Sequence, residues 1–123
     1  MEADKTQAAY KDLAVWQKSM VFADAVISLS EGLDSERKHY RLVEQLEAAA
    51  TSVPMNIAEG KGRYSPKEFV HFLHIARGSL YESMTLVELF EMRKWVRPES
   101  TQALQVQADE IGRMINGLIR ALS

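Results

Sequence analysis

The spacing of apolar residues is the feature of this 123-residue chain that most restricts its fold. In four segments apolar side chains recur at alternating intervals of three and four residues, the pattern of a stripe along one side of an α-helix. No segment alternates with a period of two over a useful length, so we expect no β-strands. The four predicted stripes are Leu13, Trp16, Met20, Ala23 and Ile27; Val43, Leu46, Ala50, Val53 and Ile57; Phe69, Leu73, Ala76, Leu80, Ser83, Val87 and Phe90; and Leu104, Ala108, Ile111, Ile115, Leu118 and Leu122.

Residues that stop and start helices separate these stripes. Gly32 ends the first predicted helix, and Asp34 or Ser35 is a candidate N-cap for the second. Residues 65–68 (SPKE) read as a capping box, in which the serine caps the third helix and the glutamate reaches back to the cap amide. Residues 97–100 (RPES) mark the turn before the fourth helix. Each connection is therefore short.

Short connections favour antiparallel neighbours, so we predict an all-α, antiparallel up-down-up-down four-helix bundle. The bundle domain is expected over residues 10–123, after a flexible N-terminal tail over residues 1–9 that has no periodicity. The chain contains no cysteine, which excludes disulfides and thiolate zinc sites. Its apolar runs are too short to span a membrane, and no signal peptide is evident, so we expect a cytoplasmic protein. A net charge of −2 argues against coating nucleic acid by charge alone.

The third predicted helix carries more apolar residues than one bundle core needs. Its additional apolar residues are Val70, Phe72, Ile75, Leu86 and Leu89. An apolar arc this broad indicates a helix that is buried on more than one side. Two explanations stay open, a deep core within one chain or a subunit interface, and the small size of the bundle favours the interface.

Residues 52–63 (SVPMNIAEGKGR) place a proline and two glycines at the end of the second predicted helix. Pro54 predicts a kink there, and Gly60 predicts a left-handed C-terminal residue. Glu59 is unfavourably placed against the helix dipole, so we expect a cationic partner such as Arg63 or Arg77. This polar group either braces the turn between two helices or meets a partner molecule.

No catalytic, cofactor-binding or metal-binding residue is predicted. Two Glu-x-x-His units, at residues 36–39 and 68–71, match the spacing of di-iron bundles. Both begin antiparallel helices, however, so they fall at opposite ends of the bundle, on the order of 30 Å apart. His71 and His74 are one turn apart, a surface pair that is more typical of solvated or interfacial side chains than of a metal site. No serine is spaced from a histidine as a nucleophile pair requires, so we predict no enzymatic activity.

Basic residues gather in two places. Residues 61–77 hold four basic residues and one acidic residue, a formal charge of +3, and residues 93–97 hold a second group. Repeated around a symmetric oligomer, such groups would form a ring of positive potential, although solvated helix ends explain them as well. The candidate contacts for nucleic acid or a partner are Lys61, Arg63, Lys67, Arg77, Arg93 and Lys94.

Four separated motifs resemble the four-helix bundle proteins of the 23S rRNA intervening-sequence family. The motifs are residues 12–18 (DLAVWQK), 45–46 (QL), 52–60 (SVPMNIAEG) and 72–82 (FLHIARGSLYE). The resemblance covers residue 11 to about residue 95, and the fourth helix fits by pattern only. It implies a cytosolic bacterial bundle that assembles as a homopentamer. The family includes the accessory variability protein of diversity-generating retroelements, which binds a reverse transcriptase and nucleic acid.

The resemblance also implies a set of residues that determine fold and assembly. These are Asn56, Glu59, Gly60, Arg63, Gly78, Ser79 and Glu82. The chain departs from the family where arginines often follow the glutamine-leucine pair, because Glu47 and Ala48 stand there. The leading hypothesis is therefore a non-enzymatic homo-oligomeric scaffold, pentameric by resemblance, that acts through a protein partner. The alternative is an RNA- or DNA-binding accessory factor of the retroelement type.

Overall fold

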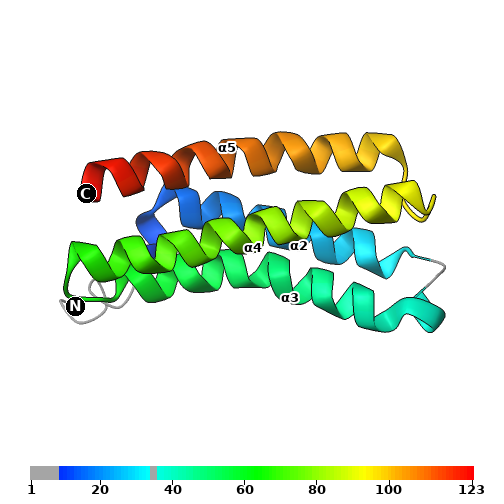
Figure 1. The fold of residues 1–123 in the computed structure, drawn as a ribbon, viewed down its shortest axis with the longest axis horizontal. Coiled ribbons are helices and arrows are strands. Elements are labelled where there is room, and N and C mark those ends of the chain that lie inside the picture. Colours follow the sequence, from blue (N-terminus) through cyan, green and yellow to red (C-terminus); the bar gives the residue numbers. More distant parts are fainter. Residues whose placement is uncertain (1–8, 34–35) are drawn as a thin grey trace.

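The computed structural model describes residues 9–33 and 36–123, and these residues form four long α-helices and one short 3-10 helix (Figure 1). The elements, in chain order, are the 3-10 helix η1 (Ala9–Asp12), α2 (Ala14–Glu31), α3 (Glu36–Lys61), α4 (Pro66–Met92) and α5 (Pro98–Leu122). No strand occurs in this part of the chain. The predicted all-α fold is confirmed.

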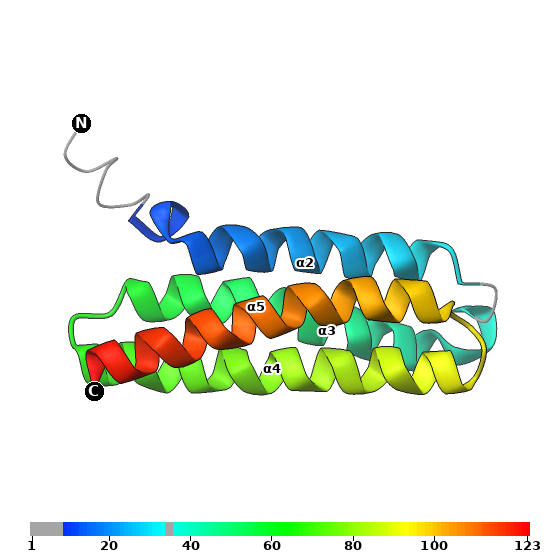
Figure 2. The ribbon, with the colours of Figure 1, turned by 90° about the horizontal axis from the view of Figure 1, so that it is seen from above.

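The four helices occupy the corners of a bundle, and each runs antiparallel to the next along the chain (Figures 1 and 2). α3 packs against α2 and α4, and α5 closes the arrangement by packing against α4 and α2. α2 and α4 therefore lie diagonally across the bundle, as do α3 and α5. The starts of α3 and α4 lie at opposite ends, as predicted from the two Glu-x-x-His units (Figure 1).

The core comes from the predicted stripes of α3, α4 and α5. All five predicted positions of α3 and all seven of α4 are buried. In α5 the stripe is buried from Leu104 to Ile115, and Leu118 and Leu122 are partly buried against the core. Heptad spacing therefore located the core face of these three helices correctly.

The stripe predicted for α2 is correct in part, since Ala23 is buried and Leu13 and Trp16 are partly buried against the core. Met20, which was assigned to the core, is 45% exposed, whereas Phe22 and Val26 are fully buried. The buried side also includes Ser19 and Ser30, whose polar side chains hide the true stripe in the sequence. Ser19 tolerates burial because its hydroxyl donates to the carbonyl of Trp16 at 2.8 Å.

The ends of the helices follow the predicted chemistry where the structure describes them. Ser65 caps α4, its Oγ accepting from the amide of Glu68 at 3.1 Å, and Pro66 is the first residue of the helix. The glutamate carboxylate reaches the Ser65 hydroxyl at 3.3 Å and not the cap amide. The candidate N-caps at positions 34 and 35, and residues 1–8 of the predicted tail, lie outside the described residues. Ala9, the last residue of that tail, begins η1.

The interruption of α3 is not at Pro54. Helical backbone continues through this proline to Lys61, and the non-helical dihedral angles within the helix are those of His39 (φ −122°, ψ 31°). The His39 ring stacks on Trp95, with centroids 4.5 Å apart, and so connects the start of α3 to the turn between α4 and α5. The helix therefore runs through Pro54 without a break, and its departure from helical dihedral angles lies near its opposite end.

Candidate interaction surfaces

Gly60 serves close packing between α3 and α4 and not a left-handed helix end. It is buried within α3, and no glycine in the described part of the chain has a positive φ. A Cβ atom on Gly60 would lie 2.7 Å from the Cβ of Phe72 and 3.3 Å from the carbonyl oxygen of Phe69. The left-handed conformation predicted for Gly60 is therefore wrong. The residue is glycine because α4 crosses too close for any side chain.

Glu59 pairs with Arg63 across one helical turn at the end of α3. The carboxylate Oε2 and the guanidinium Nη2 are 2.7 Å apart, and the guanidinium also lies over the ring of Phe72, 4.8 Å from its centroid. Both charged side chains are about half exposed. Arg77, the other predicted partner, contacts different groups. The pair braces the turn from α3 to α4, and its exposure limits its contribution to about 1 kcal/mol or less.

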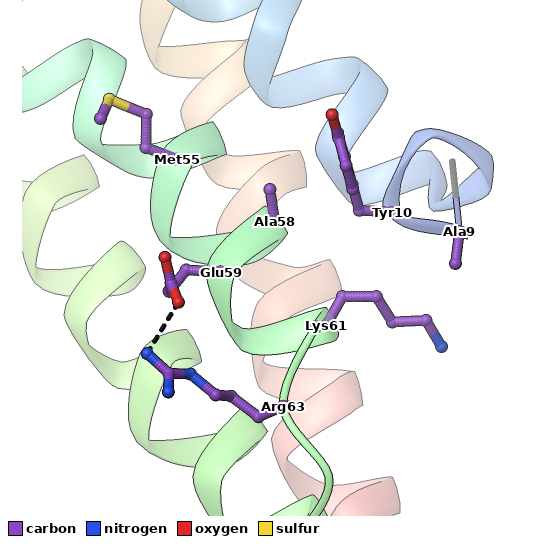
Figure 3. Close-up of a pocket in the computed structure, with 8 residues that line it drawn as sticks. Ala9, Tyr10, Met55, Ala58, Glu59, Lys61 and Arg63 are labelled. Atoms are coloured by element: carbon purple, nitrogen blue, oxygen red, sulfur yellow. Dashed lines mark hydrogen bonds and ion pairs between the residues drawn. The ribbon is translucent and has the colours of Figure 1, made fainter. Parts of the chain in front are cut away.

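An open groove of about 620 Å³ lies beside this ion pair, between η1 and the end of α3 (Figure 3). Tyr10, Met55 and Ala58 give it apolar walls, and Glu59 and Arg63 bond to each other at its edge. Since the one carboxylate that lines the groove is already paired, the groove offers no convergent set of acid, base and nucleophile.

Three of the predicted family residues join α3 to α4 through polar contacts. The hydroxyls of Ser52 and Ser79 are 2.8 Å apart, and the Asn56 amide donates to both the hydroxyl and the carbonyl of Ser52 at 2.8 Å. Farther along, the Gln45 amide donates to the Glu82 carboxylate at 3.2 Å. The Ser52–Ser79 and Gln45–Glu82 contacts fix how far α3 is displaced along α4, because each pairs a group on one helix with a group on the other. Asn56 supports the first contact from within α3 by holding Ser52.

The predicted basic contacts do not form one surface within a chain. Lys61, Arg63 and Lys67 are exposed around the α3–α4 turn, whereas Arg93 and Lys94 are exposed at the opposite end of the bundle. The sixth contact, Arg77, is partly buried midway between the ends and faces α5. The structure thus separates the candidates into three places.

Lys94 closes α4 in a left-handed conformation, with φ of 65°. Its amide bonds the carbonyl of Glu91 at 2.8 Å, and the next amide, of Trp95, bonds that of Phe90 at 2.9 Å. These two bonds, with the Phe90 and Trp95 rings 5.1 Å apart, make a Schellman motif. This motif could not be predicted from the sequence, because the residue that usually marks it is glycine.

The outer side of α4 carries a second heptad-spaced series, which we call the α4 outer stripe. All of its members are exposed, and Ile75, Leu89 and Met92 are its large apolar side chains, with 39%, 40% and 79% of their surface accessible. The stripe consists of His71, Ile75, Gly78, Glu82, Thr85, Leu89 and Met92. Leu86, in contrast, is 7% exposed in the core, and Phe72 is partly buried against Gly60. The additional apolar residues of α4 therefore fall into two groups, because some fill the core and others remain on the surface.

In residues 9–33 and 36–123, no three His, Cys, Asp or Glu side chains are grouped as metal ligands. None of the helices in these ranges has the length and apolar character needed to cross a bilayer.

The sequence matches the family described as 23S rRNA-intervening sequence protein over residues 11–117. The chain belongs to this family. The match extends through most of α5, which the motifs quoted above did not cover, and the predicted family resemblance is confirmed. No curated protein matches the sequence.

The fold of this family member is also similar to a solved structure. That structure is of a protein with unknown function from the S23 ribosomal protein family of Bacteroides thetaiotaomicron VPI-5482, with a TM-score of 0.80 and 25% sequence identity. The similarity covers 86% of this chain and 98% of the other. This neighbour shares the fold of the chain over most of its length, and its function is described as unknown.

Proposed function

We propose that this intervening-sequence family protein is a non-enzymatic, homo-oligomeric scaffold that acts in the cytoplasm through protein partners. The family resemblance implies that the oligomer is a pentamer. The observation that carries the proposal is the α4 outer stripe, a heptad series on a helix whose opposite side already fills the core. The function of the scaffold is to present several copies of one surface to a partner.

The α4 outer stripe has the composition of a helix-packing surface. Ile75 and Leu89 are two heptads apart, and Gly78 and Thr85 are small residues between them. A Cβ atom on Gly78 would have no neighbour within 4 Å, so the helix surface is open at that point. Small residues between apolar ones let a second helix approach closely and bury the larger side chains. Glu82, bonded to Gln45, places a carboxylate in the middle of the series, and such a group favours one register of association.

The test is the mass of the protein in solution at micromolar concentration. We expect light scattering to give a multiple of the 13.9 kDa chain mass, with five chains as the expected number. The double substitution Ile75→Glu and Leu89→Glu should reduce the mass to that of one chain, because it places like charges where two apolar surfaces meet. Circular dichroism should remain helical, since both side chains are already exposed within one chain.

Val106→Glu is the matched control for this substitution. Val106 is 65% exposed on α5, so the change has the same chemistry outside the α4 outer stripe and should leave the mass unchanged. A monomeric wild-type protein would refute the proposal. Equal effects of the α4 and α5 variants would remove the α4 outer stripe as the interface.

A nucleic-acid-binding accessory factor is the second candidate, favoured by one observation. Lys61 and Lys67 are exposed on the α3–α4 turn, and no ion pair in the described part of the chain includes either of them. Retention on heparin that weakens steeply with salt would favour this candidate. Failure to bind at low salt would exclude it.

A further inference from the structure

Arg77 is held in place by two neutral groups between α4 and α5. Its Nη1 donates to Oδ1 of Asn116 at 2.7 Å, and its Nη2 lies 2.9 Å from Nδ1 of His74. A guanidinium can only donate hydrogen bonds, so the imidazole must accept through Nδ1 and is neutral in this contact. The side chain is therefore fixed in one geometry while its positive charge has no compensating carboxylate among these partners.

Two further arginines extend this charge along α5. Arg113 and Arg120 lie three residues before and four residues after Asn116, so they occupy the same side of that helix. Both are exposed. Within residues 9–33 and 36–123 no ion pair involves Arg77, Arg113 or Arg120. We call these three arginines the α4–α5 cationic strip.

One of the two acidic residues nearest in register is neutralised elsewhere, since Glu110 pairs with Lys18 of α2 at 3.3 Å. Asp109, one turn before Arg113, accepts from the neutral amide of Gln105 at 2.8 Å and leaves one carboxylate charge beside the three arginines. On α4, Glu82 is bonded to Gln45 of α3, on the other side of the helix from Arg77. The strip thus has a local positive charge in a chain whose net charge is −2.

We propose that the α4–α5 cationic strip is the docking surface for a short acidic segment of a partner protein. The docking proposal rests on the function proposed above, because it specifies the chemistry of the protein partner that the scaffold would bind. Arg77 supplies a preorganised guanidinium, which loses little rotational freedom on binding a carboxylate. Arg113 and Arg120 add exposed donors one turn to either side of it.

Charge and neighbouring side chains favour an acidic peptide over nucleic acid. A long polyanion would cross surfaces outside the strip, and the chain as a whole holds 17 acidic against 15 basic residues. A segment of a few residues would meet only the strip. Tyr81, one turn beyond Arg77 and 56% exposed, adds an aromatic surface of the kind that protein interfaces favour.

The experiment measures the fluorescence anisotropy of labelled octaglutamate with the full chain, beside an eight-nucleotide single-stranded DNA and octalysine. We expect octaglutamate to bind most tightly and salt to weaken its binding. Arg113→Gln with Arg120→Gln should weaken it by about tenfold, the effect of two lost exposed charge contacts. These two exposed positions are preferred to Arg77, because Arg77 joins two helices and its loss would also loosen the fold.

Arg93→Gln with Lys94→Gln is the matched control, since it removes the same charge at the α4–α5 turn, away from the strip. The control should bind octaglutamate like the wild type. Equal weakening by both variants, or no binding of octaglutamate, would overturn the proposal, and tighter binding of the DNA through the strip would replace it with a nucleic-acid site. Light scattering on the same samples tests the oligomeric scaffold separately, so either proposal can fail alone.

Discussion

Two residues of the chain occupy positions where packing or backbone conformation favours glycine, and the first is Gly60. Alanine there would press its Cβ against the backbone of α4, so Gly60→Ala should destabilise the fold by about 1–3 kcal/mol. Gly117→Ala, within α5, is the matched control, because a Cβ there would have only the Arg120 guanidinium as near as 4.0 Å and alanine favours a helix by about 0.5–1 kcal/mol. Urea unfolding at one protein concentration measures both changes. A Gly60 variant as stable as the wild type would show that α4 can move away at no cost.

The second residue is Lys94, an L-amino acid in a conformation that suits glycine. Lys94→Gly should stabilise the protein by about 1 kcal/mol, because it removes the crowding of Cβ at positive φ and keeps both Schellman hydrogen bonds. Arg93→Gly, one position earlier in right-handed helical backbone, should instead lower stability by a few tenths to about 1 kcal/mol. Thermal unfolding of the two variants distinguishes them by the sign of the change in Tm.

At the level of the helices, periodicity predicted the core residues of α3, α4 and α5 well, and those of α2 only in part. Two apolar series compete in α2, one through Trp16 and Met20 and the other through Phe22 and Val26. The buried series also contains Ser19 and Ser30, so hydrophobicity alone favoured the wrong side. Which of the two apolar series is buried depends on the shape of the surface that the neighbouring helices present to α2.

This register of α2 has a measurable consequence. Phe22→Ala should cost about 3–5 kcal/mol of stability, because it empties a fully buried site, whereas Met20→Ala should change stability by about 0.5 kcal/mol or less. Chemical denaturation of the two variants provides the comparison. Similar costs at both positions would indicate that α2 packs with the side predicted from the sequence.

The candidate surfaces were harder to predict than the bundle. The family motifs drew attention to residues at the α3–α4 contact, where Ser79 bonds Ser52 and Asn56 holds Ser52 in place, and to Arg77. They gave no sign of Arg113 and Arg120, which lie in α5 beyond the motifs and become neighbours of Arg77 only when α5 folds back along α4. The spacing of residues within one helix predicts which side of that helix is apolar. It does not predict which charges of two different helices lie together, because that depends on how the folded helices are aligned.

For the molecule as a whole, the arrangement of the helices separates the surfaces by task. The α4 outer stripe lies on the side of α4 that faces away from the bundle core. α2 lies diagonally across the bundle from α4 (Figure 2). An assembly built on the α4 outer stripe therefore turns α2 away from its contacts. The α4–α5 cationic strip lies beside the assembly surface, on the α5 side of α4, so a bound segment would sit next to a junction between copies.

The two tryptophans lie at opposite ends of this bundle, because Trp16 is near the start of α2 and Trp95 is in the turn between α4 and α5. Figure 1 shows that these two parts of the chain are at opposite ends. Trp16 meets Tyr10 edge to face, with ring centroids 5.2 Å apart, whereas Trp95 stacks on His39. Each end thus contains its own intrinsic fluorophore in a distinct aromatic environment. Replacing either tryptophan with phenylalanine leaves an optical reporter of the remaining end, and the pair of variants can reveal whether the bundle melts as one unit or frays from one end first.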